Sequence, residues 1–247
     1  MNKNKYLSLC AAAVFSASCC AAYPEKPIRI VTPFPAGSVT DIVARPLAAK
    51  LSEAWGATVI VDNRSGAGGT LAGDVVAKAA PDGYTLLIGA TGPVVVNALL
   101  YAKMPYDVQR AFAPITLAAT AGLMLVVHPS MPIANAKDLV VLGRSRPGQL
   151  TYGSSGVGST PHLAGALFTA MTGVHMIHVP YKGGSPQYTI DLITGRLELA
   201  FASMAPVIPH VKSGRLKVLG TSADKRDPQF PEVPTIAESG VPGYDMR

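Results

Sequence analysis

The stretch LTYGSSGVGSTPHLAGALFTAMTG, residues 150–173, runs from a short apolar strand through a Gly/Ser-rich loop into a helix. Thr160 followed by Pro161 is a typical helix start, because proline suits the first helical position. The same order recurs where IRIVTPF, residues 28–34, leads into a helical pattern over 39–55. Short apolar strands that alternate with helices predict an α/β architecture with parallel sheets and right-handed crossovers.

The alternation continues along the chain. Strand patterns cover 57–64, 84–90, 123–130, 150–155, 175–181, 197–203 and 216–223, and helical patterns cover 70–80, 92–101, 136–145, 160–173, 185–195 and 205–214. The uncharged run 111–127 approaches the length of a membrane span, but its proline, threonine and glycine residues divide it. We expect two buried strands there, 114–119 and 122–127. Pro46 conflicts with the helix over 39–55 and costs it about 3 kcal/mol unless the helix kinks.

The amino end, residues 1–22, has the pattern of a secretory signal peptide. Lys3 and Lys5 precede an apolar run that ends in small residues. We expect cleavage before Tyr23 and export to the periplasm. A short membrane anchor is the alternative, although the run lies near the lower length limit for spanning. Removal of the two lysines would lower the formal net charge from +6 to +4.

All three cysteines, Cys10, Cys19 and Cys20, lie in this amino-terminal segment. The mature chain would therefore carry no thiol and no disulfide, which fits a periplasmic protein with a large core. Cys19 follows a degenerate lipobox, so lipid anchoring at Cys19 is the alternative to simple secretion.

The composition argues against several classes of protein. With 49% hydrophobic and 15% charged residues, the chain is globular rather than disordered. The basic residues are scattered and have no interleaved aromatic residues, so nucleic-acid binding has no support. His175 and His178 lie an odd number of positions apart on an expected strand and point to opposite faces. We expect no metal site and no cofactor.

Five loops that follow strands and begin helices are rich in glycine, serine, threonine or proline. They cover 32–41, 89–94, 152–162, 181–187 and 200–206. In an open α/β sheet such loops lie at the carboxyl ends of the strands, where ligands bind. Each helix N-terminus there contributes about 0.3–1 kcal/mol toward binding an anion. The alternative is that the hydroxyl residues only cap the helices, but five such loops together favour an anion site.

Three of these loops carry helix-cap signatures. Ser38 and Asp41 match the S-x-x-D capping box. Thr160 and Ser185 each stand directly before a proline, as expected of an N-cap followed by proline at the first helical position. Free amides and positive dipole ends are therefore expected to gather at one edge of the fold.

Other loop chemistries fit less well. A P-loop requires Gly-Lys-Ser/Thr, and neither 65–73 nor 156–162 supplies the lysine. The dinucleotide fingerprint fails because Leu71 stands where a glycine is required. A hydrolase elbow, G-x-S-x-G, does not match residues 153–156, which read Gly-Ser-Ser-Gly. His162 falls in the first turn of a helix, where we expect it to cap or pack rather than act as a base.

Several segments carry a family resemblance: YPEKPIRIVTPFPAGSVTDIVARPLA (23–48), VDNRSGAGG (61–69), AKAAPDGYTLLIG (77–89), LAGALFTAMTGVHMIHVPYKGG (163–184) and VPTIAESGVPGY (233–244). In this order they resemble the periplasmic substrate-binding proteins of tripartite tricarboxylate transporters, the Bug family. The resemblance implies a monomeric, two-domain receptor that closes on a di- or tricarboxylate, an acidic amino acid or an aromatic acid. It implies a binding protein rather than an enzyme, with membrane permease subunits or a sensor kinase as its partner.

Position by position, the resemblance implies ligand-binding roles in both domains. The matching residues are Phe34, Pro35, Ala36, Gly37, Ser38, Asp41, Thr91, Ser154, Ser155, Ser159, Thr160, His162, Lys182, Ala202 and Ser203. The chain departs from the family at Ser38, where relatives have a second glycine, and at Ala202-Ser203, where relatives often have an acid or amide.

The resemblance also implies a domain division. We expect a signal peptide over 1–22, domain 1 over 23–121 and 223–247, and domain 2 over 122–222. Relatives continue for several dozen residues beyond VPGY, so domain 1 is expected to lack its C-terminal part.

Three functional hypotheses follow. In a carboxylate receptor, the hydroxyls of Ser154, Ser159 and Thr160 and the loop amides hold a ligand carboxylate, and the Gly37-Ser38 loop holds the ligand from the other domain. A secreted serine hydrolase would use Ser155 instead and turn over esters. A periplasmic signalling or structural module would bind another protein without any small ligand.

Overall fold

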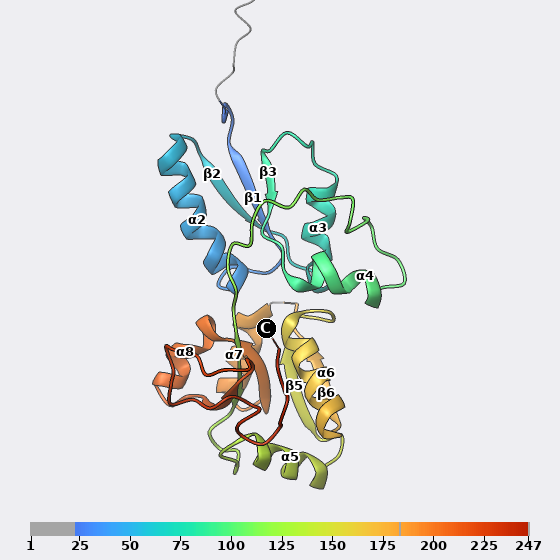
Figure 1. The fold of residues 1–247 in the computed structure, drawn as a ribbon, viewed down its shortest axis with the longest axis vertical. Coiled ribbons are helices and arrows are strands. Elements are labelled where there is room, and N and C mark those ends of the chain that lie inside the picture. Colours follow the sequence, from blue (N-terminus) through green and yellow to red (C-terminus); the bar gives the residue numbers. More distant parts are fainter. Residues whose placement is uncertain (1–22, 183, 247) are drawn as a thin grey trace, which may run out of the picture.

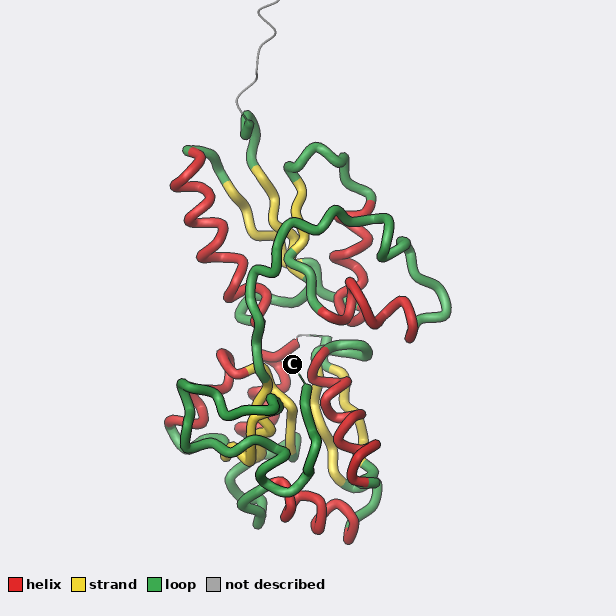
Figure 2. Tube along the Cα trace, in the orientation of Figure 1, coloured by secondary structure: helices red, strands yellow, loops and turns green. Residues whose placement is uncertain are grey.

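The computed structural model describes residues 23–182 and 184–246, which form two α/β lobes (Figures 1 and 2). We call residues 23–121 the first lobe and residues 122–246 the second lobe. The expected signal peptide, 1–22, lies outside the described residues. Among residues 23–182 and 184–246, none of the helices combines the length and the apolar composition of a membrane span.

The first lobe is built on a three-stranded parallel sheet of order β2-β1-β3. Its elements are β1 (Ile28–Thr32), α2 (Val39–Trp55), β2 (Val59–Asn63), the turn η1 (Ala67–Gly69), α3 (Thr70–Ala77), β3 (Thr85–Leu87), the turn η2 (Gly92–Val96) and α4 (Asn97–Leu100). Helix α2 packs on the sheet through Ala44 and Ala48, which meet Ile30 of β1. The helix continues through Pro46, which stands on its exposed face, where water can satisfy the carbonyl that proline leaves unpaired.

The second lobe contains a five-stranded sheet of order β6-β5-β7-β4-β8. Its elements are β4 (Leu123–Val127), α5 (Ala136–Ser145), β5 (Leu150–Ser154), α6 (Thr160–Thr172), β6 (Met176–Pro180), α7 (Gly184–Ile193), β7 (Leu199–Ser203), α8 (Met204–Lys212) and β8 (Lys217–Thr221). Strand β5 pairs in parallel with β6 and β7, whereas β4 is antiparallel to both β7 and β8. The expected α/β class with mostly parallel sheets is confirmed.

Hydrophobic cores lie on both faces of the five-stranded sheet. On one face, Phe168 of α6 packs against Phe201 of β7. On the other face, Tyr188 and Leu192 of α7 cover the sheet. Every residue of β4 and β7 is buried, as expected for strands that are covered on both faces. The second lobe is therefore a three-layer arrangement with a rigid central sheet.

The prediction of a strand over 114–119 is wrong. Residues 113–122 have no regular secondary structure, and the side chains of Ile115 and Leu117 are 78% and 79% exposed. Only residues 123–127 of the apolar run form a strand, because there β4 enters the second sheet between β7 and β8. Apolar composition predicted burial, but a strand also needs a neighbouring strand with which to pair.

Residues 223–246 lie on the second lobe, whereas we expected them in domain 1 with the first sheet. Ile236, Val241 and Tyr244 belong to the core beneath α5 and α6. The Tyr244 hydroxyl donates a hydrogen bond to the carbonyl of Ala164 at 2.9 Å, and Thr235 forms a parallel bridge with Thr221 at the end of β8. Apolar side chains in VPTIAESGVPGY thus cover the second sheet.

Candidate functional site

The loops after the strands of one lobe meet the loops after the strands of the other lobe (Figure 1). A Cβ built on Gly184, at the start of α7, would lie 3.0 Å from Cδ of Pro35 and 3.7 Å from Oγ of Ser155. A Cβ built on Gly156 would lie 3.5 Å from Cα of Gly68. The carboxyl ends of the parallel strands therefore converge between the lobes, as the loop pattern predicted.

In the first lobe, the loop after β1 meets the second lobe through the ring of Pro35 and the backbone of Gly37. Ala36 and Gly37 are exposed, Phe34 and Pro35 are half-buried, and Ser38 is buried. The φ angle of Gly37 is +78°, which favours glycine, and a Cβ there would lie 3.6 Å from Pro186 of α7. Pro35 and Gly37 thus form the face of this loop that the second lobe meets.

Asp41 anchors this loop instead of facing the space between the lobes. Its side chain is 4% exposed, and its carboxylate accepts hydrogen bonds from the Gly37 amide and from Nε of Arg45, each at 2.9 Å. Burial raises the pKa of Asp41, but the hydrogen bonds from Arg45, Gly37 and Asn63 outweigh it and hold the pKa below its ordinary value. Asp41 is therefore charged and fixes the conformation of the loop.

The capping box expected between Ser38 and Asp41 does not form. Ser38 is the N-cap of α2, but its side chain makes no capping bond and instead lies 3.2 Å from the Thr40 hydroxyl. Asp41 accepts from the amide of Gly37, one residue earlier than the box requires. Ser38 and Asp41 still stand at the start of α2, but Asp41 pairs with the Gly37 amide instead of the Ser38 amide.

Sequence reasoning missed Asn63, at the end of β2. Its side-chain amide lies within hydrogen-bond distance of Thr32 Oγ1 at 2.7 Å, the Phe34 carbonyl at 2.9 Å and Oδ1 of Asp41 at 2.9 Å. Asn63 thus ties the end of β1 to the start of α2. The signal in the sequence is weak: a lone asparagine after a strand resembles an ordinary turn residue.

In the second lobe, two of the expected carboxylate-binding hydroxyls are used inside the loop itself. Ser154 is fully buried and Ser159 is 1% exposed. Oγ of Ser154 accepts from the Gly156 amide at 3.0 Å, and the Ser159 hydroxyl donates to the Gly156 carbonyl at 2.7 Å. These serines shape the loop over 154–159, hereafter the serine loop, and do not present their hydroxyls to solvent.

Ser155 and Thr160 are the residues of this segment with free donors. Both are half-buried, and among the described residues neither their hydroxyls nor their amides have a hydrogen-bond partner. Ser159, not Thr160, is the N-cap of α6, and Thr160 is the first helical residue. The sequence placed the helix start one residue late, and the loop before that start contacts the first lobe, with Gly156 against Gly68 and Gly158 against Gly92.

His162 and His178 lie beside the serine loop. Nδ1 of His162 accepts from the Gly158 amide at 3.3 Å, and the two imidazole centroids are 4.4 Å apart. Burial lowers the pKa of His162; burial and then the proximity of His162 lower the pKa of His178 to about 4. The expectation that His162 packs or caps agrees with this geometry, whereas the role of His178 was missed.

The other expected residues lie at the rim or beneath the site. Thr91 is exposed at the start of η2, where a Cβ on Gly92 would lie 2.9 Å from the Gly158 carbonyl. Lys182 is exposed on the loop after β6. Ala202 is fully buried within the core under α7 and α8, and Ser203 is the N-cap of α8.

Helix α7 begins at Gly184, one residue before the expected N-cap at Ser185. Ser185 is 4% exposed inside the first turn, with Pro186 next to it. The positive end of the α7 dipole therefore lies at Gly184, directly against Pro35 and Ser155.

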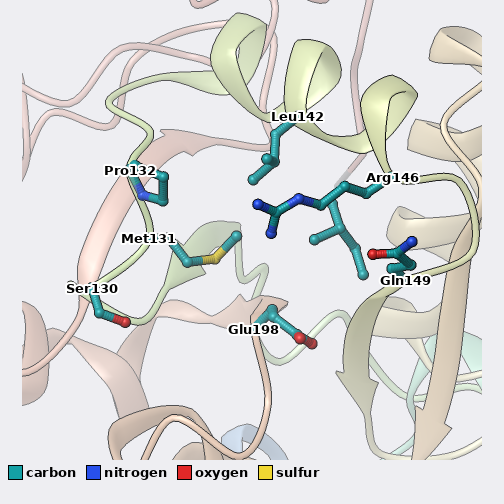
Figure 3. A pocket seen from close by; sticks show the side chains of 8 residues that line it. Ser130, Met131, Pro132, Leu142, Arg146, Gln149 and Glu198 are labelled. Atoms are coloured by element: carbon teal, nitrogen blue, oxygen red, sulfur yellow. The ribbon is translucent and has the colours of Figure 1, made fainter.

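The depressions on the described surface include the following two. One, of about 580 Å³, opens beside the meeting loops and is lined by Ala36, Gly37, Pro186, Thr189, Ile190, Ile193, Thr194, Pro206, His210 and Arg215. The other, of about 280 Å³, lies at the amino ends of β5 and β7, where Arg146 extends between Leu142 and Glu198 (Figure 3). The second is at the opposite end of the sheet from the loops and contains none of the expected site residues. No group of three potential metal ligands occurs among the described residues.

Two α/β lobes with mostly parallel sheets and facing strand-end loops define the class of periplasmic binding proteins. An R. palustris protein solved with adipate shares the fold with a TM-score of 0.88 and 41% identity, over 91% of this chain and 75% of that protein. MatC from Rhodopseudomonas palustris, solved with bound malate, has a TM-score of 0.85 and 29% identity, over 91% of this chain and 76% of MatC.

Residues 43–247 match the tripartite tricarboxylate transporter family receptor, and the chain belongs to this family, to which the Bug proteins belong. The UPF0065 protein of the tcbD-tcbE intergenic region in Pseudomonas sp. strain P51 is 42% identical over 91% of this chain and 67% of its own length. BugT of Bordetella pertussis is 37% identical over 90% of this chain and 68% of its own length. The chain thus spans about two thirds of the length of these relatives.

Proposed function

We propose that the protein is a periplasmic receptor that binds a small carboxylate between the two lobes. The observation that carries the proposal is the meeting point of Pro35, Ser155 and Gly184, where two helix N-termini of the second lobe face a glycine loop of the first. Helix N-termini attract anions through unpaired amides and the positive dipole end. Lys182 adds a positive charge at the rim.

Affinity arithmetic requires donors from more than one loop. Micromolar binding corresponds to about −8.2 kcal/mol. A hydrogen bond to a charged group contributes about 1.5–3 kcal/mol, whereas binding costs roughly 4–15 kcal/mol in lost freedom. One loop cannot meet this requirement, so we propose that the first-lobe loop over Pro35–Gly37 and the Ser155 and Thr160 donors act on the same ligand.

The ligands of the solved relatives support a dicarboxylate. Adipate and malate, which are bound by the two R. palustris proteins, each carry two carboxylates. Two carboxylates match two separate helix N-termini, at α6 and at α7. We therefore propose a dicarboxylate as the ligand class.

Calorimetry tests this proposal. Adipate and malate should release or absorb heat with the mature protein, and Ser155→Ala or Thr160→Ala should weaken affinity roughly tenfold to hundredfold through a lost charged hydrogen bond. Thr169→Ala is the matched control, because it lies nine residues further along α6, about 13 Å away, and should leave affinity unchanged. If all three folded variants bind with the affinity of the wild type, this site is ruled out.

The cellular setting and partners are also proposals. Residues 1–22 would direct export and be removed before Tyr23, so the intact mass of periplasmic protein should start at that residue. Retention of a lipidated Cys19 would contradict simple secretion. We further propose that the receptor acts as a monomer, that domain 1 includes residues 23–121 and domain 2 residues 122–222, and that it delivers its ligand to membrane permease subunits or signals to a sensor kinase.

A further inference from the structure

The serine loop is held by a side-chain network centred on β6 that none of the functional hypotheses uses. Oγ of Ser154 lies 2.6 Å from Nε2 of His178, although the two residues are 24 positions apart. The same Oγ accepts from the Gly156 amide at 3.0 Å. His178 therefore fixes the hydroxyl that fixes the turn of the loop.

His162 holds the second half of the loop. Its Nδ1 accepts a hydrogen bond from the Gly158 amide, and its ring lies against His178. Tyr152 of β5 also stacks on His178, with centroids 5.0 Å apart. The imidazole of His178 is thus packed against two rings, which restrict its orientation.

We propose that His178, together with His162, is a positioning pair that sets the shape of the serine loop and thereby the affinity of the ligand site. This inference rests on the proposed function, because the free donors of Ser155 and Thr160 belong to the same segment. The pair acts through Ser154 and Gly158 and does not itself touch the ligand.

The contacts of the pair depend on its protonation state. Nδ1 of His162 accepts a hydrogen bond from Gly158, so it carries no hydrogen. The Ser154 hydroxyl, which accepts from the Gly156 amide, can donate either to Nε2 of His178 or to the Gly156 carbonyl 3.2 Å away. A neutral His178 with no hydrogen on Nε2 accepts from Ser154, and we assign the working state to this form. A charged His178 would donate at Nε2, and the Ser154 hydroxyl would then donate to the Gly156 carbonyl.

The surroundings of the pair keep it neutral. The titratable groups that face His178 are Tyr152 from β5 and His162 from α6. Burial, followed by the proximity of His162, lowers the pKa of His178 to about 4. The loop should hold its shape at neutral pH and lose it as the pH falls toward 4.

The same contact could suggest a serine nucleophile and its histidine base, but the surroundings do not suit that role. Ser154 has no exposed surface, so a substrate cannot reach it. The partner imidazole has a pKa of about 4, far below the optimum for a base at neutral pH. A positioning role fits both a serine with no exposed surface and an imidazole that is neutral at neutral pH.

Two substitutions separate positioning from simple packing. His178→Phe keeps the stacked ring and loses the bond to Ser154, so affinity for adipate or malate should fall about three- to tenfold. His178→Gln keeps a neutral amide in reach of Ser154 and cannot be charged. It should retain most of the affinity at pH 7 and lose less affinity than the wild type does between pH 6.5 and 4.

The readout that does not depend on a ligand is the NMR titration of the free protein. The amide signal of Gly156 should shift with the titration of the His178 imidazole in the wild type and stay flat in His178→Gln, whereas the Gly158 amide, which is bonded to His162, should shift in both. If the wild type binds no dicarboxylate, the proposed function fails, while this titration still decides whether the pair shapes the loop. Unchanged affinity in folded His178→Phe, or amides of Gly156 and Gly158 that ignore the titration, would overturn the proposal.

Discussion

The two lobes contribute loops to one site, but their hydrophobic cores differ in size. The second lobe buries aromatic and aliphatic side chains on both faces of a five-stranded sheet. The first lobe has three strands, and its hydrophobic cluster is small: Ile30, Ala44 and Ala48. Several of its large side chains are exposed, among them Leu99 at 86%. From this difference we expect the second lobe to be the more rigid half of the site and the first lobe the more flexible half.

The two lobes also fix their loops by different chemistry. In the first lobe, the charged carboxylate of Asp41 gathers Gly37, Arg45 and Asn63. In the second lobe, neutral groups of Ser154 and His178 hold the turn. A charged anchor and a neutral anchor respond to acid at different pH values, which allows the two halves to be tested apart.

The largest expected effect is in the second-lobe core. Phe168→Ala removes a fully buried ring that packs against Phe201 and Tyr244, and it should lower the free energy of unfolding by about 3–5 kcal/mol. Denaturant unfolding followed by circular dichroism measures this. Ile115→Ala, at a side chain that is 78% exposed, is the control and should change stability by less than about 0.5 kcal/mol. Equal effects would erase the distinction between the lobes.

A smaller effect is expected in the first-lobe core. Ile30→Ala should cost the first lobe about 2–3 kcal/mol, because the small cluster around it can partly collapse into the space. Native-state hydrogen exchange should then show faster exchange in β1 to β3 and unchanged protection in β4 and β7. Loss of protection in all strands would mean that the lobes unfold as one unit.

The anchor of the first-lobe loop should matter less than either core. Asp41→Asn removes charged hydrogen bonds to Arg45 and Gly37 and should cost about 1–3 kcal/mol at neutral pH. Because the folded-state pKa of Asp41 lies below its unfolded value, its contribution is complete above the unfolded pKa and disappears as the pH falls through the folded pKa. Stability curves of the wild type and the variant should therefore converge below pH 4. Parallel curves down to pH 2 would contradict the assignment.

The smallest effect is expected at a bond between the lobes. The Tyr101 hydroxyl donates to the Val157 carbonyl at 3.4 Å, which is long for a hydrogen bond, and the pair is exposed. Tyr101→Phe should change stability and affinity by less than about 0.5 kcal/mol. A larger loss, measured by thermal melting and calorimetry, would show that the first lobe depends on the second for its stability.

Local patterns in the sequence predicted the regular elements well. The helices over 39–55 and 136–145 match α2 and α5 residue for residue, because apolar periodicity and turn residues mark both ends. The strand over 114–119 failed since pairing depends on partners remote in sequence. Hydrophobicity alone could not decide between a buried strand and an exposed segment.

The sequence predicted which loops form the candidate site but not the hydrogen bonds within it. The sequence placed Ser154 at the right turn, yet its burial and its contact with His178 join residues on neighbouring strands. The alternation expected over 175–181 predicted that His175 and His178 point to opposite faces of the sheet. It could not reveal that one of these rings reaches across to β5, because register is a property of the folded sheet.

The contact between the lobes at Gly68 and Gly156 is backbone against backbone. Such a contact buries little apolar area, so it adds little free energy to the joined arrangement. The less free energy the contacts between two lobes supply, the more modestly a ligand needs to prefer the joined state to change the populations. Full conversion from 1:99 to 99:1 takes about 5.5 kcal/mol of differential binding, and a smaller initial difference takes less. Glycines at this contact would thus leave more of the joining free energy to the ligand.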